Sequence, residues 1–495
     1  MKRRLALAAA LVPLLCRMLG VPPPAHAADT FNITGYVESE FRLTVQGKSR
    51  FTFNENTFQL SLFAFPVDDV SLLGSFRLVG IGVDDRVPRE FITITQQSNP
   101  ESVDPVRVLL DEAYIHVTGL VFKNLDVKLG KQRIQWGTGD QFNPTDNLNP
   151  DDLWDPLLFG KKIPTSALQL NYYAGPVTIT GVLLPLFTPA LLPEADVRGI
   201  GELQFRSMAG GITIDTGYPG LDDLIDQLMD TLLPSMELGE LLIRSRLPTK
   251  SARNISAAVK VASNLRGVDF SVSYAYVHDD FGVPRQVNMS IPLEQLNVVN
   301  VVTLLEYPRQ HVFGFDFTTS IPKLDVGFWG ELAYFISEPF PTEYYISVGT
   351  EKYRWLGEVI DLTPLAGQGI RIATDHPLEK DFIKAVAGLD YTFPGAYYVN
   401  VQYVRGLPNA NTAATVHDFV WGGVDKPFYH DVFKARFFFG YDFNDGSAVA
   451  YPSLYWWPMD ALELHVGTFF VFGQLNTQLG AFGDSFAFLR GRYTF

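Results

Sequence analysis

The sequence predicts an all-β fold: a single transmembrane antiparallel β-barrel with long extracellular loops. Three observations predict it: an N-terminal export segment, repeated alternation of apolar and polar residues, and a final segment that ends on an aromatic residue. Aromatic residues make up 13% of the chain, with 38 Phe and 21 Tyr. After the export segment no stretch offers the roughly 18 uninterrupted apolar residues of a spanning helix, so a helical membrane protein is not expected.

The first 27 residues have the pattern of a secretory signal peptide. Three cations at positions 2–4 precede an apolar run over 5–16, and Ala25-His26-Ala27 supplies the small residues of a cleavage site. We expect Sec-type export with cleavage after Ala27, which leaves a barrel domain over 28–495. Cys16 is the only cysteine, so the exported chain has no disulfide framework and no thiolate metal site.

The chain is acidic. Its formal net charge is -15, and the signal segment holds four cations and no carboxylate, which leaves -19 for the exported part. So acidic a surface does not favour nucleic acid as a partner.

Alternation with a period of two recurs along the whole exported chain, as barrel strands require. Residues 255–261 and 268–276 alternate on either side of an Asn-Leu-Arg-Gly turn, and 383–393 and 397–403 alternate around Pro394-Gly395. Seventeen segments read as strands: 31–41, 51–63, 69–83, 105–118, 123–135, 165–174, 176–187, 254–264, 267–278, 308–320, 324–337, 381–393, 395–406, 429–443, 447–457, 461–473 and 485–495. Because both barrel ends should lie in the periplasm, the count must be even; 16 is preferred and 18 is possible.

Three features favour a membrane barrel over a soluble β-sandwich. Aromatic residues gather at strand ends, short turns alternate with long loops, and the chain stops at Tyr493 and Phe495. That ending resembles the closing-strand signal read by the barrel assembly machinery, which is therefore an expected partner. We expect the protein in the outer membrane of a Gram-negative (diderm) bacterium, among its lipid and lipopolysaccharide.

Alternation also predicts which polar side chains point into the lumen. At Gly130 the phase is ambiguous: Lys131 and Arg133 would follow Leu129 outward unless a bulge reverses the strand, and the bulge is preferred. The mixed charges suit a general pore. The expected lumen-lining residues are Glu112, Tyr114, His116, Lys128, Lys131, Arg133, Lys260, Asp269, Glu331, Lys384, Asp390, Arg405, Arg490 and Arg492.

The long loop over 136–164 is rich in Asp, Asn and Pro. One hypothesis makes it a constriction in the lumen, built from Trp136, Asp140, Asp146, Asp151 and Asp152. A second places Ca²⁺ at Asp146, Asp151 and Asp152, because carboxylates are its usual ligands, although no EF-hand spacing is present. A solvated loop stabilised by Asx turns is the simpler alternative.

A second long loop, over 188–253, contains leucines and aspartates at helical spacing. They predict a short amphipathic helix near 219–233, which caps the barrel or forms a gate. The preceding segment, 182–193, is unusually apolar for an extracellular loop and is expected to contact lipid or line an apolar path.

Several motifs point to a known family. The stretch 129–137 (Leu-Gly-Lys-Gln-Arg-Ile-Gln-Trp-Gly) with its Asn-Pro-rich loop, Glu-Ala-Tyr at 112–114 and Trp-Gly-Glu-Leu-Ala-Tyr at 329–334 resemble a proteobacterial outer-membrane barrel family of unknown function. The resemblance covers about a third of the chain, and the general layout is similar to alginate-export-type barrels. It implies a barrel fold and an RND-type exporter, of the kind that handles lipids or hydrophobic compounds, as a partner.

The sequence favours transport over catalysis. No Gly-x-Ser-x-Gly, His-Glu-x-x-His or Walker motif is present, and a His beside an Asp on a strand points to the opposite face. We expect no enzyme activity and no cofactor. The predicted function is a porin-like channel for small or amphiphilic solutes; the alternatives are a conduit for lipids or hydrophobic compounds and a structural or adhesive barrel with a plugged lumen.

Overall fold

The structure is a computed structural model of the whole chain. It describes residues 31–47, 49–84, 103–192, 237–291, 297–321, 325–348, 370–378, 380–474 and 477–495. The predicted signal peptide and the predicted helix near 219–233 lie outside these residues.

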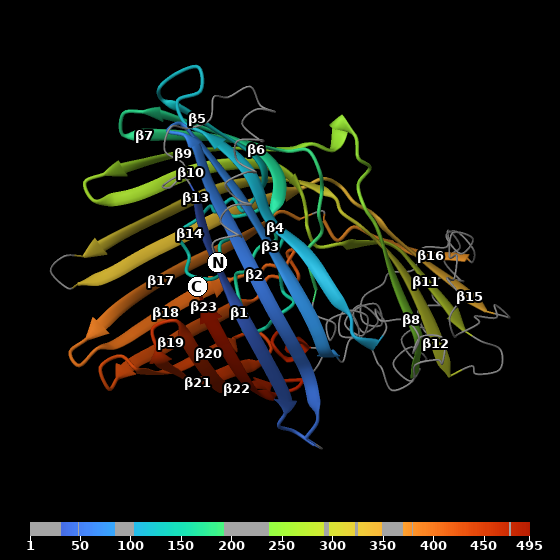
Figure 1. Cartoon of the computed structure of the whole chain (residues 1–495). Coiled ribbons are helices and arrows are strands. Elements are labelled where there is room, and N and C mark those ends of the chain that lie inside the picture. The colour runs from blue at the N-terminus through green and yellow to red at the C-terminus, as the bar shows by residue number, and fades with distance from the viewer. Residues whose placement is uncertain are drawn as a thin grey trace.

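Eighteen strands form one closed antiparallel barrel (Figure 1). Each barrel strand pairs with the next along the chain, and β23 pairs back with β1 to close the wall. The strands are β1 (Phe31–Thr44), β2 (Phe51–Val67), β3 (Val70–Asp84), β4 (Val106–Val117), β5 (Leu125–Gln132), β6 (Thr165–Ala174), β7 (Val177–Leu184), β9 (Ser256–Leu265), β10 (Val268–His278), β13 (Arg309–Ile321), β14 (Val326–Ser337), β17 (Phe382–Phe393), β18 (Tyr397–Arg405), β19 (Asp418–Phe428), β20 (Phe433–Asp442), β21 (Ala448–Met459), β22 (Leu462–Phe472) and β23 (Phe486–Thr494).

All seventeen expected segments correspond to barrel strands, and the one missed is β19. Its Gly422-Gly423 pair and Pro427 resemble a turn more than a strand. A small residue is needed at position 422 because a Cβ on Gly422 would lie 2.9 Å from the ring of Phe439, its pairing partner on β20. Adding β19 gives eighteen, the second of the two even counts that the sequence allows.

The two faces of the wall differ as a membrane barrel requires. On β14, Glu331, Ala333 and Phe335 are at most 3% exposed, whereas Leu332 between them is 45% exposed. The outer face is therefore apolar. Aromatic side chains are exposed on it near the short turns, including Tyr172, Phe393, Tyr397, Trp456 and Tyr493. An apolar band with aromatic girdles is the surface that hydrocarbon and its interface select.

The two rims of the barrel carry different connections. Tight turns join β2 to β3 and β9 to β10, whereas long loops follow β5, β7, β10 and β14 at the opposite rim. Beyond this rim, to the right in Figure 1, a mixed five-stranded sheet extends from the barrel. It comprises β8 (Glu237–Arg246), β11 (Val283–Ile291), β12 (Val298–Glu306), β15 (Thr342–Val348) and β16 (Ile370–Asp375).

That sheet was not expected from the sequence, which treats 188–253 as loop although β8 lies within it. It is built from three excursions that leave the wall separately, and β8 and β15 join the β11–β12 hairpin by parallel pairing. The described helical elements are two 3₁₀ turns, η2 (Ala252–Asn254) and η3 (Gly480–Phe482). Within the described part of the chain, no helix is long and apolar enough to cross a membrane.

Candidate functional site

The chain leaves the barrel wall after β5 and rejoins it at β6, and residues 133–164 between them form what we call the lumen loop. Its Trp136 is 3% exposed and belongs to one apolar cluster with Val182 of β7 and Ala258 of β9. These wall residues point inward, since Leu183 and Val259 beside them are 44% and 41% exposed on the outer face. The lumen loop therefore folds into the barrel.

An aromatic anchor holds the loop against the opposite wall. It consists of Phe142 and Phe159 from the loop, and Trp421, Phe438, Phe469 and Phe482 from β19, β20, β22 and η3. The ring centroids of Phe142 and Phe159 lie 5.0 Å and 5.3 Å from that of Trp421. Phe159 also packs edge-on against Phe482 at 5.4 Å. Because one loop contacts both β7–β9 and β19–β22, it crosses the lumen.

Glu331 on β14 fixes the middle of the loop. Its carboxylate accepts hydrogen bonds from the backbone amides of Thr138, Gly139 and Thr145, and from the Thr145 hydroxyl at 2.8 Å. A Cβ on Gly137, which has φ 85°, would lie 2.4 Å from Glu331 Oε1. Glycine is therefore required here both by the backbone conformation and by the close approach of the carboxylate.

The aspartates of the loop are held by lysines. Asp151 pairs with Lys162 at 2.8 Å and Asp152 with Lys161 at 2.7 Å. Although burial alone would lower it, the pKa of Lys162 is held above its usual value by Asp151 and Asp146. Burial raises the pKa of Asp146 to about 7, against the opposing effect of Lys162. These pairings link the loop to itself.

The predicted Ca²⁺ site is not formed by these residues. Among the described residues, the carboxylates of Asp146, Asp151 and Asp152 do not make up a group whose oxygens lie within 4.8 Å of one another. Two of the three face lysine nitrogens, which compete with a cation for the same oxygens. Asp140, the remaining acidic residue of the predicted constriction, is exposed.

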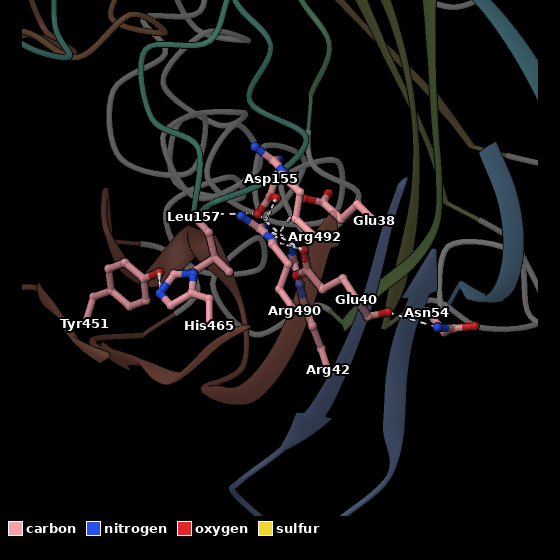
Figure 2. Close-up of polar contacts among 10 residues, drawn as sticks. All are labelled: Glu38, Glu40, Arg42, Asn54, Asp155, Leu157, Tyr451, His465, Arg490 and Arg492. Carbon is pink, nitrogen blue, oxygen red and sulfur yellow. Dashed lines mark hydrogen bonds and ion pairs between the residues drawn. The ribbon is translucent and has the colours of Figure 1, made fainter. Parts of the chain in front are cut away.

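A seam cluster of six charged residues fixes the last part of the loop where β23 closes on β1 (Figure 2). Its members are Glu38, Glu40 and Arg42 on β1, Arg490 and Arg492 on β23, and Asp155 in the lumen loop.

In the seam cluster, the carboxylate of Asp155 joins two arginines. One oxygen accepts from Arg42 Nη2 at 2.7 Å and the other from Arg490 Nη2 at 3.3 Å. Glu40 accepts from Arg42 Nε at 2.6 Å and from Arg490 Nε at 2.7 Å, and Glu38 accepts from Arg492 Nε at 2.6 Å. Burial would raise the pKa of Asp155, but the two arginines hold it below its usual value.

Most of the expected lumen residues occupy the alternate strand positions whose side chains point into the barrel, which we call the inward phase. Lys128 Nζ lies 3.8 Å from the Tyr114 ring, Lys260 Nζ lies 5.2 Å from the Trp136 ring, and Lys384 Nζ donates to the carbonyl of Pro408 at 2.9 Å. The set with this phase is Glu112, Tyr114, His116, Lys128, Lys260, Asp269, Glu331, Lys384, Asp390, Arg490 and Arg492.

Two expected lumen residues, Lys131 and Arg405, have the outward phase instead, and a third, Arg133, belongs to the lumen loop and not to a wall strand. The β4–β5 and β5–β6 ladders pass Gly130 without a register shift, so the preferred bulge is absent and Lys131 keeps the outward phase of Leu129. Lys131 donates to the carbonyl of Leu110 instead. Arg133 lies beyond the end of β5 and faces Glu112 at 3.7 Å. Arg405 has the outward phase of Tyr403, and both contact Asp418.

The sequence predicted Glu331 and Arg490 as lumen residues but not the other residues that connect the loop to the wall. No local sequence pattern distinguishes Asp155, Phe142 and Phe159 from other residues of the loop. Trp421 lies on β19, the strand that was not predicted. One signal was available: Glu38, Glu40 and Arg42 alternate with Val37, Ser39 and Phe41, which marks three inward charges in the first strand. Their partner Asp155 is 113 residues from Arg42, and no local pattern shows that contact.

Comparison with known proteins adds little to this geometry. No family model and no curated protein matches the sequence. Among solved structures, OccAB1 of Acinetobacter baumannii is 9% identical, with a TM-score of 0.44 over 94% of this chain and 96% of that one. Salmonella typhi OmpF in complex with daunomycin is 9% identical, with a TM-score of 0.39 over 94% and 97%. The fold assignment rests instead on the strand pairings of this chain.

Proposed function

We propose that this protein is an outer-membrane channel for small solutes, and that the lumen loop is its constriction. One observation carries the proposal: an eighteen-stranded wall encloses a loop that is held by specific polar contacts to Glu331, Arg42 and Arg490. Barrels of 16–18 strands are wide enough to leave an aqueous channel. A loop inside such a barrel would narrow this channel without closing it.

The inner wall supports passage of polar solutes. Its side chains include the opposed charges of the seam cluster, the Arg77–Asp111 pair and the hydrogen-bonded Gln59–Ser61–Ser75 group. A water-filled path through a barrel requires such a polar inner surface. Solute would diffuse down its gradient and be selected by the width beside the loop and by the charges that face it.

Conductance across planar lipid bilayers tests this function. Purified protein should give discrete ohmic steps, and liposomes that contain it should swell in sugars up to a limiting size. Silence in both assays, from protein whose gel migration shows a folded barrel, would contradict the channel and favour the plugged structural barrel.

A hydrophobic conduit is the second candidate, and the aromatic anchor favours it. If the lumen loop withdrew, the rings of Trp421 and Phe469 would line an apolar strip on β19 and β22. This function predicts that lipid copurifies with the protein and that the exporter partner implied by the sequence resemblance binds it. A bare channel predicts neither result.

The proposed location follows from the outer surface. The apolar band and its exposed aromatic residues require lipid around the barrel, and β23 closes the wall by pairing with β1. We therefore place the protein in the outer membrane, with the barrel assembly machinery as the partner that inserts it. Fractionation of a diderm host tests both, because depletion of that machinery should remove the protein from outer-membrane fractions.

A further inference from the structure

The seam cluster contains one carboxylate from a loop and two from a strand of the barrel wall. Glu38 and Glu40 lie on β1 and are fixed by its pairing with both neighbours, whereas Asp155 lies in the lumen loop. Wall residues cannot leave without opening the barrel. Asp155 can leave by a local rearrangement of the loop.

The arginines are held in place without Asp155. The guanidinium of Arg42 lies 4.3 Å from the Phe53 ring centroid and 4.9 Å from that of Phe486, and its Nε donates to Glu40. Arg490 donates from Nε to the other oxygen of Glu40. Stacked and hydrogen-bonded arginines keep their orientation, so a site for a planar anion would persist after the loop had moved.

The arginine site is unfavourable when Asp155 has left it, because its positive charge is then not fully compensated. The cluster has three arginines and three carboxylates, and the side chains of Arg42 and Arg490 are each 8% exposed. Removal of Asp155 leaves one uncompensated positive charge in a poorly hydrated part of the wall. A buried charge without its partner is strongly destabilised, so an anion that can take the place of Asp155 is favoured.

From these contacts we infer that Arg42 and Arg490 form a binding site for the carboxylate of a permeating organic acid, which Asp155 occupies when the loop is docked. A solute carboxylate would accept one hydrogen bond from each arginine, as Asp155 does. Charge-assisted pairs of this type favour planar oxyanions over spherical ions such as chloride. The inference rests on the proposed channel function for the role of the bound acid, but the binding itself does not.

Calorimetric binding of benzoate to the detergent-solubilised full chain tests the inference. Asp155→Asn and Asp155→Ala remove the internal competitor, and each should bind benzoate about tenfold or more tightly than wild type. Adding Arg42→Gln to either variant should abolish that gain. Arg405→Gln is the matched control, because it removes an arginine from an outward-facing ion pair and should leave affinity unchanged.

Two other ligands define the chemistry of the site. Benzamide, which is isosteric and neutral, should bind all variants equally weakly, and chloride should bind Asp155→Asn less tightly than benzoate does. Equal benzoate affinity in wild type and both Asp155 variants would overturn the inference, as would benzamide or chloride binding as tightly as benzoate. Bilayer recordings of the same samples judge the channel separately: silence with tight benzoate binding would refute the proposed function and leave the site intact.

Discussion

The lumen loop is attached to two neighbouring parts of the wall by different kinds of interaction. On the side of β19–β22 it is held by the aromatic anchor, in which Phe142 and Phe159 pack against Trp421. At the barrel seam it is held by Asp155 between Arg42 and Arg490. Packing of aromatic rings depends on the shape of the neighbouring side chains and not on dissolved ions. In an ion pair, by contrast, another anion can take the place of the carboxylate. If the proposed carboxylate site exists, the seam is therefore the attachment at which a dissolved anion would act on the loop.

The largest effect should follow from removing a ring of the aromatic anchor. Phe159→Ala deletes the ring that contacts Phe142, Trp421, Phe438, Phe469 and Phe482, and should destabilise docking of the loop by about 3 kcal/mol. Hydrogen exchange of residues 138–160 should accelerate while the strands stay protected. Phe443→Ala, at an outer ring that is 60% exposed, is the control and should change neither.

A smaller effect is expected at Glu331. Glu331→Gln keeps the shape but removes the charge to which the Thr138, Gly139 and Thr145 amides donate, which should cost docking about 1.5–3 kcal/mol. Exchange should then increase first at residues 137–145 and later near Asp155. Simultaneous loss of protection along the whole loop would show that the two sides are not separately attached.

The pH dependence should be weaker still and confined to the loop. Because the pKa of Asp146 rises on folding from 3.8 to about 7, the folded protein retains a proton that the unfolded chain releases in this interval. Docking should therefore weaken as pH rises from about 4 to about 7. Lys162, Asp151 and Glu331 are the charged groups that act on Asp146.

Asp146→Asn should flatten that pH dependence, measured as exchange rates of the lumen loop after correction for the chemical effect of pH. The substitution should not remove the pH dependence completely. Asp280, whose carboxylate accepts a hydrogen bond from the backbone amide of Asp151 in the loop at 2.8 Å, also has its pKa raised by burial to about 7. An unchanged pH slope in the variant would show that Asp146 does not titrate in the docked loop.

The smallest effect is expected outside the lumen. Arg405 pairs with Asp418 on the outward side, and its side chain is 43% exposed. Arg405→Gln should change stability by about 0–1 kcal/mol and leave conductance unchanged. A change in ion selectivity would place Arg405 in the conduction path after all.

The sequence was sufficient to predict the strands of the barrel wall but not the contacts inside the lumen. Alternation identified every barrel strand except β19, because Gly422, Gly423 and Pro427 break the local pattern while pairing with β18 and β20 fixes the strand. Inward phase could likewise be predicted for Glu331 and Lys384. The prediction failed at Lys131, where the sequence favoured a bulge at Gly130 that would turn this lysine inward and that the ladders do not contain.

Contacts within the lumen depend on distant residues, and a single sequence does not show them. Asp155 is 113 residues from Arg42 and 335 from Arg490 in the sequence. It contacts these two arginines only because the fold of the loop places it beside them. The five-stranded sheet escaped prediction for the same reason, since β8 and β15 become strands by parallel pairing with β12 and β11. Trp136 was identified because its type is conspicuous, but its cluster on β7 and β9 was not.

Whether the lumen loop narrows a conducting barrel is tested most directly by the single-channel conductance of a variant in which a short Gly-Ser linker replaces residues 138–160. Heat-modifiable gel migration shows that the barrel of this variant has folded. We expect a conductance several times that of wild type and a larger limiting solute in liposome swelling. A folded variant whose conductance and size limit equal those of wild type would contradict it.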